Sequence, residues 1–120
     1  MEVIIAPKAQ SDIVSILAWT QENFGPQTLK RYAKLIETAI EGIAVDRDCA
    51  GSVRRPEIAE ACRTYHLFHS RKRAGTRGKR VRLPRHLLLY RVAGAGVVEI
   101  GRVLHDSVDL EQHLPEEYRG

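Results

Sequence analysis

The sequence lacks several features that would place it in a specialised class of protein. It has only two cysteines, Cys49 and Cys62, and their spacing matches neither a CxxC redox pair nor a four-ligand zinc pattern. No apolar run approaches the roughly 20 residues that a membrane-spanning helix needs. No basic leader followed by a long apolar segment opens the chain. We therefore expect reduced, structural thiols, no membrane association and a cytoplasmic location.

Acidic residues are also absent from one third of the chain. Residues 61–98 contain ten Lys or Arg and no Asp or Glu, and eight of the ten lie between Arg71 and Arg85. The flanking segments are acidic, so the formal net charge of +4 conceals a sharply bounded basic block. Such a block favours an anionic partner. The alternative, a solvated loop whose charges only keep the protein soluble, stays open.

The composition that remains is ordinary for a globular protein. The chain has 120 residues, of which 43% are hydrophobic and 28% charged. A chain of this length can bury a core without the help of disulfides or metals, but it is too short for two domains. We therefore predict one domain spanning residues 1–120.

The N-terminal half predicts a strand followed by two helices. The apolar run Val3–Ala6 ends at Pro7, which suits a short buried strand. Apolar residues then recur at helical spacing up to Phe24, where Gly25 and Pro26 break the period, and they resume up to about Val45. Helices joined by so short a turn pack antiparallel. Trp19 is expected in the seam of this hairpin.

The C-terminal half predicts strands. Residues 64–69, 86–92 and 97–104 are rich in aromatic, Leu and Val residues, and a glycine-containing turn joins the last two. Alternation along the last segment places Val98, Ile100 and Leu104 on one face together with Arg102. Asp106 could cap a short helix that ends before Pro115. The predicted fold class is α+β: an N-terminal strand, an antiparallel helical hairpin, a three-stranded antiparallel meander and a short C-terminal helix.

This order of elements, with the phrases LLLYRV and VVEIGRVLHDSVDLEQHLP, resembles the ParE branch of the RelE/ParE toxins of bacterial toxin-antitoxin modules. The resemblance covers nearly the whole chain, and its C-terminal phrases are the most specific part. It implies a small cytoplasmic toxin held inactive by a cognate antitoxin, either ParD-like or another small DNA-binding protein. It further implies contact with operator DNA only through the antitoxin complex. The ParE branch poisons DNA gyrase, whereas the RelE branch cuts messenger RNA on the ribosome.

Two groups of candidate binding residues follow. The resemblance implies that an antitoxin segment covers apolar side chains of the second helix. The basic connection from Ser70 to Arg85 is longer than a normal hairpin loop, and Arg offers a planar donor fork that matches phosphate oxygens. The expected antitoxin-binding residues are Leu29, Tyr32, Ile36 and Ile40, and the expected target- or phosphate-binding residues are Arg71, Lys72, Arg73, Arg77, Lys79, Arg80, Arg82, Arg85, Arg102 and His105.

A nuclease would need a proton carrier, and the candidates are His66, His69, His86 and His105. His105 is the best placed because it stands at the end of the last strand beside Asp106. No second residue clearly completes a nuclease site, so a binding toxin directed at gyrase is the main hypothesis. Ribosome-dependent RNA cleavage and a plain nucleic-acid-binding module remain alternatives. His66 and His69, on one predicted strand, would point to opposite faces and should not share a metal. We expect no metal and no cofactor.

Overall fold

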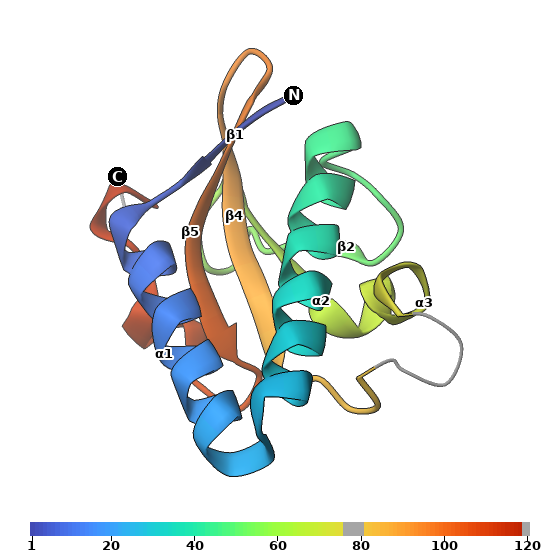
Figure 1. Cartoon of the computed structure of the whole chain (residues 1–120). Helices are drawn as coiled ribbons and strands as arrows, with labels where there is room; N and C mark the ends of the chain where they lie inside the picture. Colours follow the sequence, from blue (N-terminus) through green and yellow to red (C-terminus); the bar gives the residue numbers. More distant parts are fainter. Residues whose placement is uncertain (76–80, 119–120) are drawn as a thin grey trace.

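The computed structural model describes residues 1–75 and 81–118. A five-stranded sheet is covered on one face by a pair of antiparallel helices (Figure 1). The helices are α1 (Pro7–Phe24) and α2 (Pro26–Val45), and both begin and end where the sequence predicts. Each starts with a proline, whose fixed φ suits the first turn. Gly25 between them has φ 88°, which a residue with a side chain rarely adopts.

The sheet contains one strand more than predicted. Its order is β1 (Glu2–Ile5), β5 (Val97–His105), β4 (His86–Gly94), β3 (Cys62–His66) and β2 (Ser52–Arg54). β1 pairs parallel with β5, and every other pair is antiparallel. The sequence offered little sign of β2, because three residues among Gly, Ser and Arg carry no alternation. The predicted α+β arrangement is otherwise confirmed.

Two boundaries differ from the prediction. β3 ends at His66, and a 3-10 turn, η1 (Leu67–Ser70), follows, so His69 does not lie on a strand. η1 leads into a single helical turn, α3 (Arg71–Ala74), at the start of the basic connection. The C-terminal helix is also shorter than expected. Asp109, not Asp106, caps a 3-10 turn, η2 (Leu110–His113), and a second such turn, η3 (Glu116–Tyr118), follows.

Both faces of the sheet are buried. The main core lies between the sheet and the helices and includes Leu35, Ile43, Tyr90 and Ile100. A smaller cluster lies on the opposite face, where the C-terminal segment covers it; its members are Cys62, Leu87, Leu89, Leu104 and Tyr118. Among the described residues, no helix is long and apolar enough to cross a membrane.

A β-bulge at Gly101 overturns the predicted alternation of β5. Leu89 pairs with Arg102, whereas Tyr90 pairs with Ile100, so Gly101 has no partner on β4. One extra residue exchanges the two faces beyond it. Val103 therefore joins Val98 and Ile100 in the main core, and Leu104 belongs to the smaller cluster.

Candidate functional site

Three histidines and an aspartate meet where β3 and β5 end and β4 begins. His86 and His105 are partners in the β4–β5 register, and their ring centroids are 5.4 Å apart. His66, the last residue of β3, reaches Asp106, with its Nε2 3.0 Å from Oδ2. The antiparallel meander thus brings together side chains that are up to 40 positions apart in sequence.

Asp106 is the electrostatic centre of this group. The guanidinium of Arg85 binds both of its oxygens, with Nη2 2.8 Å from Oδ1 and Nε 3.1 Å from Oδ2. Hydrogen bonds from Arg85, together with the one from His66, hold the pKa of Asp106 well below its usual range. Asp106 in turn raises the pKa of Arg85. Asp106 is therefore a charged anchor that fixes Arg85, and it is no candidate acid at neutral pH.

Tyr32 and His86 form an uncharged pair beside this anchor. The Tyr32 hydroxyl lies 2.6 Å from Nδ1 of His86, and it accepts a hydrogen bond from the backbone N–H of Arg85 at 3.3 Å. Burial, reinforced by the neighbouring His105, lowers the pKa of His86 to about 4. Burial likewise raises the pKa of Tyr32 to about 12. At neutral pH the hydrogen bond between the hydroxyl and Nδ1 therefore joins two uncharged groups.

His105 is held by the turn that follows β5. Its Nδ1 accepts a hydrogen bond from the backbone N–H of Ser107 at 3.1 Å, and the Ser107 hydroxyl lies 2.7 Å away. A neutral imidazole that accepts at Nδ1 carries its proton on Nε2. Nδ1 thus faces the turn, and Nε2–H makes no hydrogen bond to another residue within the described ranges 1–75 and 81–118.

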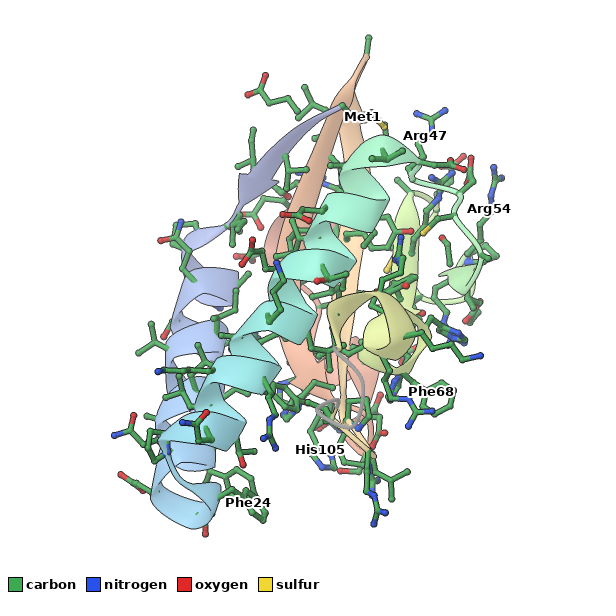
Figure 2. The ribbon with its side chains drawn as sticks, turned by 45° about the vertical axis from the view of Figure 1, so that its right-hand side comes forward. Met1, Phe24, Arg47, Arg54, Phe68 and His105 are labelled. Atoms are coloured by element: carbon green, nitrogen blue, oxygen red, sulfur yellow. The ribbon has the colours of Figure 1, made fainter. Side chains whose placement is uncertain are left out.

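A cavity of about 620 Å³ lies between the hairpin turn and the segment that leads into β4, and Tyr32, Arg85, His86 and His105 are among the residues that line it. The labelled residues Phe24 and His105 lie at this same end of the molecule (Figure 2). Trp19 also lines the cavity and is 56% exposed, so the expected place in the hairpin seam is wrong. Trp19 stands one position off the apolar stripe of α1, so its side chain points away from the main core. Its ring packs edge to face against the exposed ring of Phe24, with the two centroids 5.7 Å apart.

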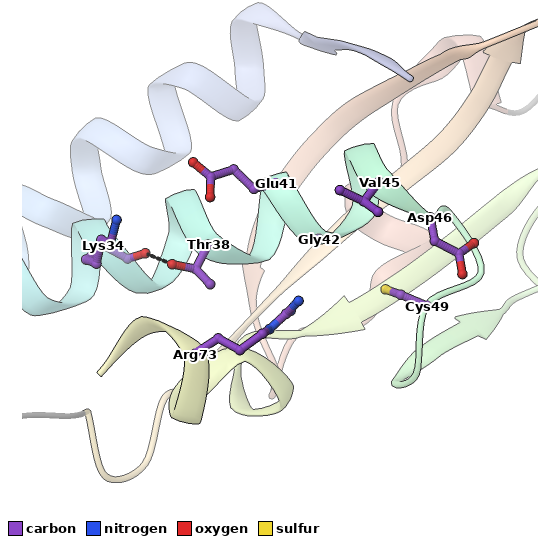
Figure 3. Close-up of a pocket in the computed structure, with 8 residues that line it drawn as sticks. All are labelled: Lys34, Thr38, Glu41, Gly42, Val45, Asp46, Cys49 and Arg73. Atoms are coloured by element: carbon purple, nitrogen blue, oxygen red, sulfur yellow. Dashed lines mark hydrogen bonds between the residues drawn. The ribbon is translucent and has the colours of Figure 1, made fainter. Parts of the chain in front are cut away.

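The basic residues chosen from the sequence occupy several different environments. Arg71 stacks on Phe68, with its guanidinium carbon 4.2 Å from the ring centroid, and donates to the backbone carbonyl of Arg82. Arg73 points back towards α2 and lies beside Gly42 (Figure 3), where it donates to Ser70 at 3.2 Å. Lys72 and Arg82 are exposed. Arg77, Lys79 and Arg80 lie outside the described residues.

Arg102 lies on β5 and contacts the first helix, α1. Its guanidinium makes a two-fold contact with Asp12 of α1, at 2.8 Å and 2.9 Å, and both side chains are less than one-fifth exposed. Asp12 also accepts from the backbone N–H of Val103 at 2.9 Å. Arg102 therefore links helix to sheet, and we do not include it in a binding surface.

The expected antitoxin-binding residues are divided between core and surface. Tyr32 and Ile36 are 7% and 3% exposed and belong mainly to the core of the domain, whereas Leu29 and Ile40 are half-buried. A shallow groove of about 320 Å³ runs between the two helices. Its apolar lining comes from Ile5, Ile13, Leu17, Ala33, Ile36 and Ile40, with Glu37 and Glu41 at its edge.

Sequence reasoning singled out His105 but missed how Tyr32, His66 and His86 surround it. Counting residues outward from the turn between the last two predicted strands would have placed His86 nearly opposite His105, since the two stand at the open ends of one hairpin. The bulge at Gly101 shifts that count by one residue. Within residues 1–75 and 81–118, no group of three His, Cys, Asp or Glu side chains is placed to hold a metal.

Comparisons with known proteins define first the fold and then the family. A solved structure titled as a chromosomal ParDE toxin-antitoxin system from P. aeruginosa superposes with a TM-score of 0.62 at 19% identity, covering 88% of this chain and 95% of that one. The two therefore share a fold. The family model described as the ParE toxin of the type II toxin-antitoxin system parDE matches residues 3–110.

Curated relatives agree with the family model. Proteins named Toxin ParE1 from Mycobacterium tuberculosis strains CDC 1551 / Oshkosh and ATCC 25618 / H37Rv are 26% identical over 111 residues, covering 92% of this chain and 95% of theirs. The chain belongs to the ParE toxin family. It is the toxin component of a type II toxin-antitoxin module, and its partner is an antitoxin.

Proposed function

We propose that this toxin arrests bacterial growth in the cytoplasm by binding DNA gyrase, and that the whole chain acts as one toxin domain. Membership of the ParE family over residues 3–110 is the observation that carries the proposal. The family resemblance in the C-terminal strands points to gyrase as the target. In this mechanism the toxin contributes a binding surface, and the chemistry on DNA belongs to gyrase.

The contact surface we propose is a basic face formed by Phe68, Arg71, Lys72, Arg82 and Arg85, next to His105. Phe68 is 46% exposed and has Arg71 stacked on it. Arginines and aromatic rings dominate the residues that contribute most to binding at protein interfaces. The positive charge of this face suits an acidic protein surface or the DNA that gyrase holds.

The antitoxin, in this proposal, covers the apolar groove between α1 and α2. Ile13, Leu17 and Ile40 line that groove and are only half-buried in the free chain. Glu37 and Glu41 at its edge would attract basic residues of the antitoxin. The toxin would then reach operator DNA only through the antitoxin.

Ribosome-dependent RNA cleavage is the second candidate, and the gathering of His105, His86 and Arg85 beside an open cavity favours it. The hydrogen bonds of the two histidines argue against RNA cleavage. Nδ1 of His86 is engaged by Tyr32, and Nδ1 of His105 is engaged by Ser107. A general base needs a free nitrogen directed at the substrate. Nδ1 of neither histidine meets this requirement, so we rank binding above nuclease chemistry.

Purified toxin tests the proposal directly. Added to gyrase and relaxed plasmid, it should block supercoiling and leave cleaved DNA trapped on the enzyme, and the antitoxin should restore supercoiling. In parallel, the toxin should leave ribosome-bound messenger RNA intact. A toxin that cuts ribosome-bound RNA and leaves gyrase unaffected would overturn the gyrase proposal in favour of the nuclease.

A further inference from the structure

The cavity of about 620 Å³ at the turn end of the helical hairpin has the size and walls of a small-molecule site. Ligand sites in proteins typically measure roughly 300–1,000 Å³ and combine apolar walls with a few convergent polar groups. Here α1 and α2 form one wall, and the segment from Val81 to His86 forms the other. The basic face proposed above for gyrase shares Arg82 and Arg85 with this cavity but does not include its aromatic residues, Trp19 and Phe24.

One wall is aromatic and exposed. Trp19 and Phe24 are 56% and 62% exposed, although their edge-to-face contact at 5.7 Å fixes them as a pair. Exposed rings of this kind are costly to leave in water and offer flat faces on which a heteroaromatic ring can stack. Their position on the last turns of α1 directs them towards the cavity rather than the core.

Cationic side chains lie on both sides of the cavity. Arg31 lines it from α2, whereas Arg82, Arg85 and His105 line it from the opposite side. Arg85 is neutralised by Asp106, but Arg31 and Arg82 have no hydrogen bond or ion pair from their side chains to any other described residue. None of the described lining residues is a carboxylate. Two uncompensated guanidinium groups therefore border the cavity, and their planar donors match the oxygens of a phosphate.

The segment from Val81 to His86, which carries Arg82 and Arg85, is fixed by contacts with its neighbours. Arg71 is stacked on Phe68 and donates to the backbone carbonyl of Arg82, which fixes the backbone that carries the second guanidinium. The backbone N–H of Arg85 donates to Tyr32 at 3.3 Å and ties the same segment to α2. These contacts hold the two walls of the cavity together in the free protein, so little ordering is needed for a ligand to bind.

We propose that this cavity binds a nucleoside phosphate, with its base against Trp19 and Phe24 and its phosphate between Arg31, Arg82 and the Nε2–H of His105. A free nucleotide and the phosphorylated end of a nucleic-acid strand present this same chemistry. The proposal does not depend on the gyrase target, because it concerns binding by the toxin alone.

The chain carries its own probe, since Trp19 is its only tryptophan. Purified toxin is titrated with ADP, adenosine, inorganic phosphate and a 5′-phosphorylated tetradeoxyadenylate while tryptophan fluorescence is recorded. ADP should change the fluorescence to saturation, and adenosine or phosphate alone should bind at least about tenfold more weakly. Tighter binding of the oligonucleotide than of ADP would identify a strand end as the ligand, and the reverse order would identify a free nucleotide; both support the site.

Variants separate the contribution of the cationic side chains from that of the aromatic ones. Arg31→Gln combined with Arg82→Gln should weaken ADP binding by about tenfold or more while leaving the melting temperature unchanged. Phe24→Ala, followed by calorimetry, should weaken ADP and adenosine alike. Arg54→Gln, an exposed arginine on β2 remote from the cavity, is the matched control and should bind as the wild type does. Absence of saturable binding by both ADP and the oligonucleotide, or ADP affinity unaffected by loss of both arginines, overturns the proposal.

Discussion

Arg102 of β5 and Asp12 of α1, 90 positions apart, form a two-fold ion pair at 2.8 Å and 2.9 Å that fastens the first helix to the sheet. The pair is largely shielded from water, and Asp12 also accepts the backbone N–H of Val103. The hydrogen bonds to Asp12 raise the pKa of Arg102 above its ordinary value. A pair with this geometry is costly to break from one side, since the remaining charge stays partly buried.

We therefore expect Asp12→Ala to lower the free energy of unfolding by about 3 kcal/mol. For a domain of this size the loss corresponds to a fall of roughly 10 °C in Tm. Lys34→Gln is the control, because the Lys34–Glu37 pair spans 3.9 Å with both side chains more than half exposed. It should change stability by less than about 0.5 kcal/mol. Equal effects of the two substitutions in urea denaturation would show that the shielding of the Asp12 pair has no energetic consequence.

His105→Gln separates a contact residue from a catalytic one. Gln retains a side-chain donor but cannot carry a proton, so a binding toxin should lose less than about tenfold in growth inhibition. Removal of a general acid or base typically costs roughly 10² to 10⁴ in rate. The measurement is the inducer concentration that halves growth, with soluble toxin quantified in parallel. A loss of a hundredfold or more in a normally folded variant contradicts the binding mechanism.

The basic face should give the toxin a salt-dependent affinity for its target. Lys72 and Arg82 are exposed and make no described side-chain contact, unlike Arg71 and Arg73, which support neighbouring structure. Lys72→Gln with Arg82→Gln should weaken gyrase inhibition and flatten its dependence on ionic strength, with stability changed by less than about 1 kcal/mol. Salt titrations of the supercoiling assay provide the measurement. If the variant inhibited gyrase with the same salt dependence as the wild type, Lys72 and Arg82 would contribute to solubility and not to binding.

His86 makes stability depend on pH in a defined window. Its folded-state pKa is about 4, below the ordinary value of 6.5, so between these values the unfolded chain binds a proton that the folded chain does not. The free energy of unfolding should therefore fall as the pH drops from about 6.5 to about 4. Below that window the depressed pKa of Asp106 takes over, since its stabilising charge is lost only at lower pH.

The comparison that isolates this effect is wild type against His86→Asn in urea denaturation at several pH values. The variant should be less stable at pH 7, because the contact with Tyr32 is altered, but it should lose less stability on acidification. Parallel pH profiles for the two proteins would mean that His86 is protonated equally in the folded and unfolded states.

Gly101 should tolerate no side chain. A Cβ at this position would lie 2.6 Å from the Tyr118 hydroxyl and 3.0 Å from Cγ of Pro115. Gly101→Ala should therefore displace the C-terminal segment and cost about 1–3 kcal/mol. Gly94→Ala is the matched control on β4, because no atom lies within 4 Å of its Cβ position. If both substitutions gave the same Tm, the packing of Tyr118 against the sheet would not contribute to stability.

Local patterns predicted the helices and the hairpin well, because prolines, Gly25 and apolar periodicity act over a few residues. The bulge at Gly101 depends on a partner strand and on Tyr118 from the C-terminal segment, so alternation alone misassigned Leu104. The short strand β2 exists because β3 offers it a partner.

The candidate site was harder to predict than the fold. His105 was noticed because it ends a strand, but its environment is assembled from α2, β3 and β4, and no spacing along the chain encodes those contacts. The basic residues chosen from the sequence share a charge but not an environment. Arg73 and Arg102 carry the same charge as Arg82, yet their positions in the fold direct them towards other protein groups.

The parallel pairing of β1 with β5 joins Glu2–Ile5 to Val97–Ile100. The ribosome synthesises the first of these strands long before the second. While most of the chain is being made, β1 therefore has no β5 to pair with, and the Asp12 carboxylate has no Arg102. A translation product that stops before residue 97 has neither the sheet edge for β1 nor the arginine for Asp12. We therefore expect toxicity to begin only after residues 97–105 have been synthesised, which gives antitoxin already present in the cell time to bind each new chain.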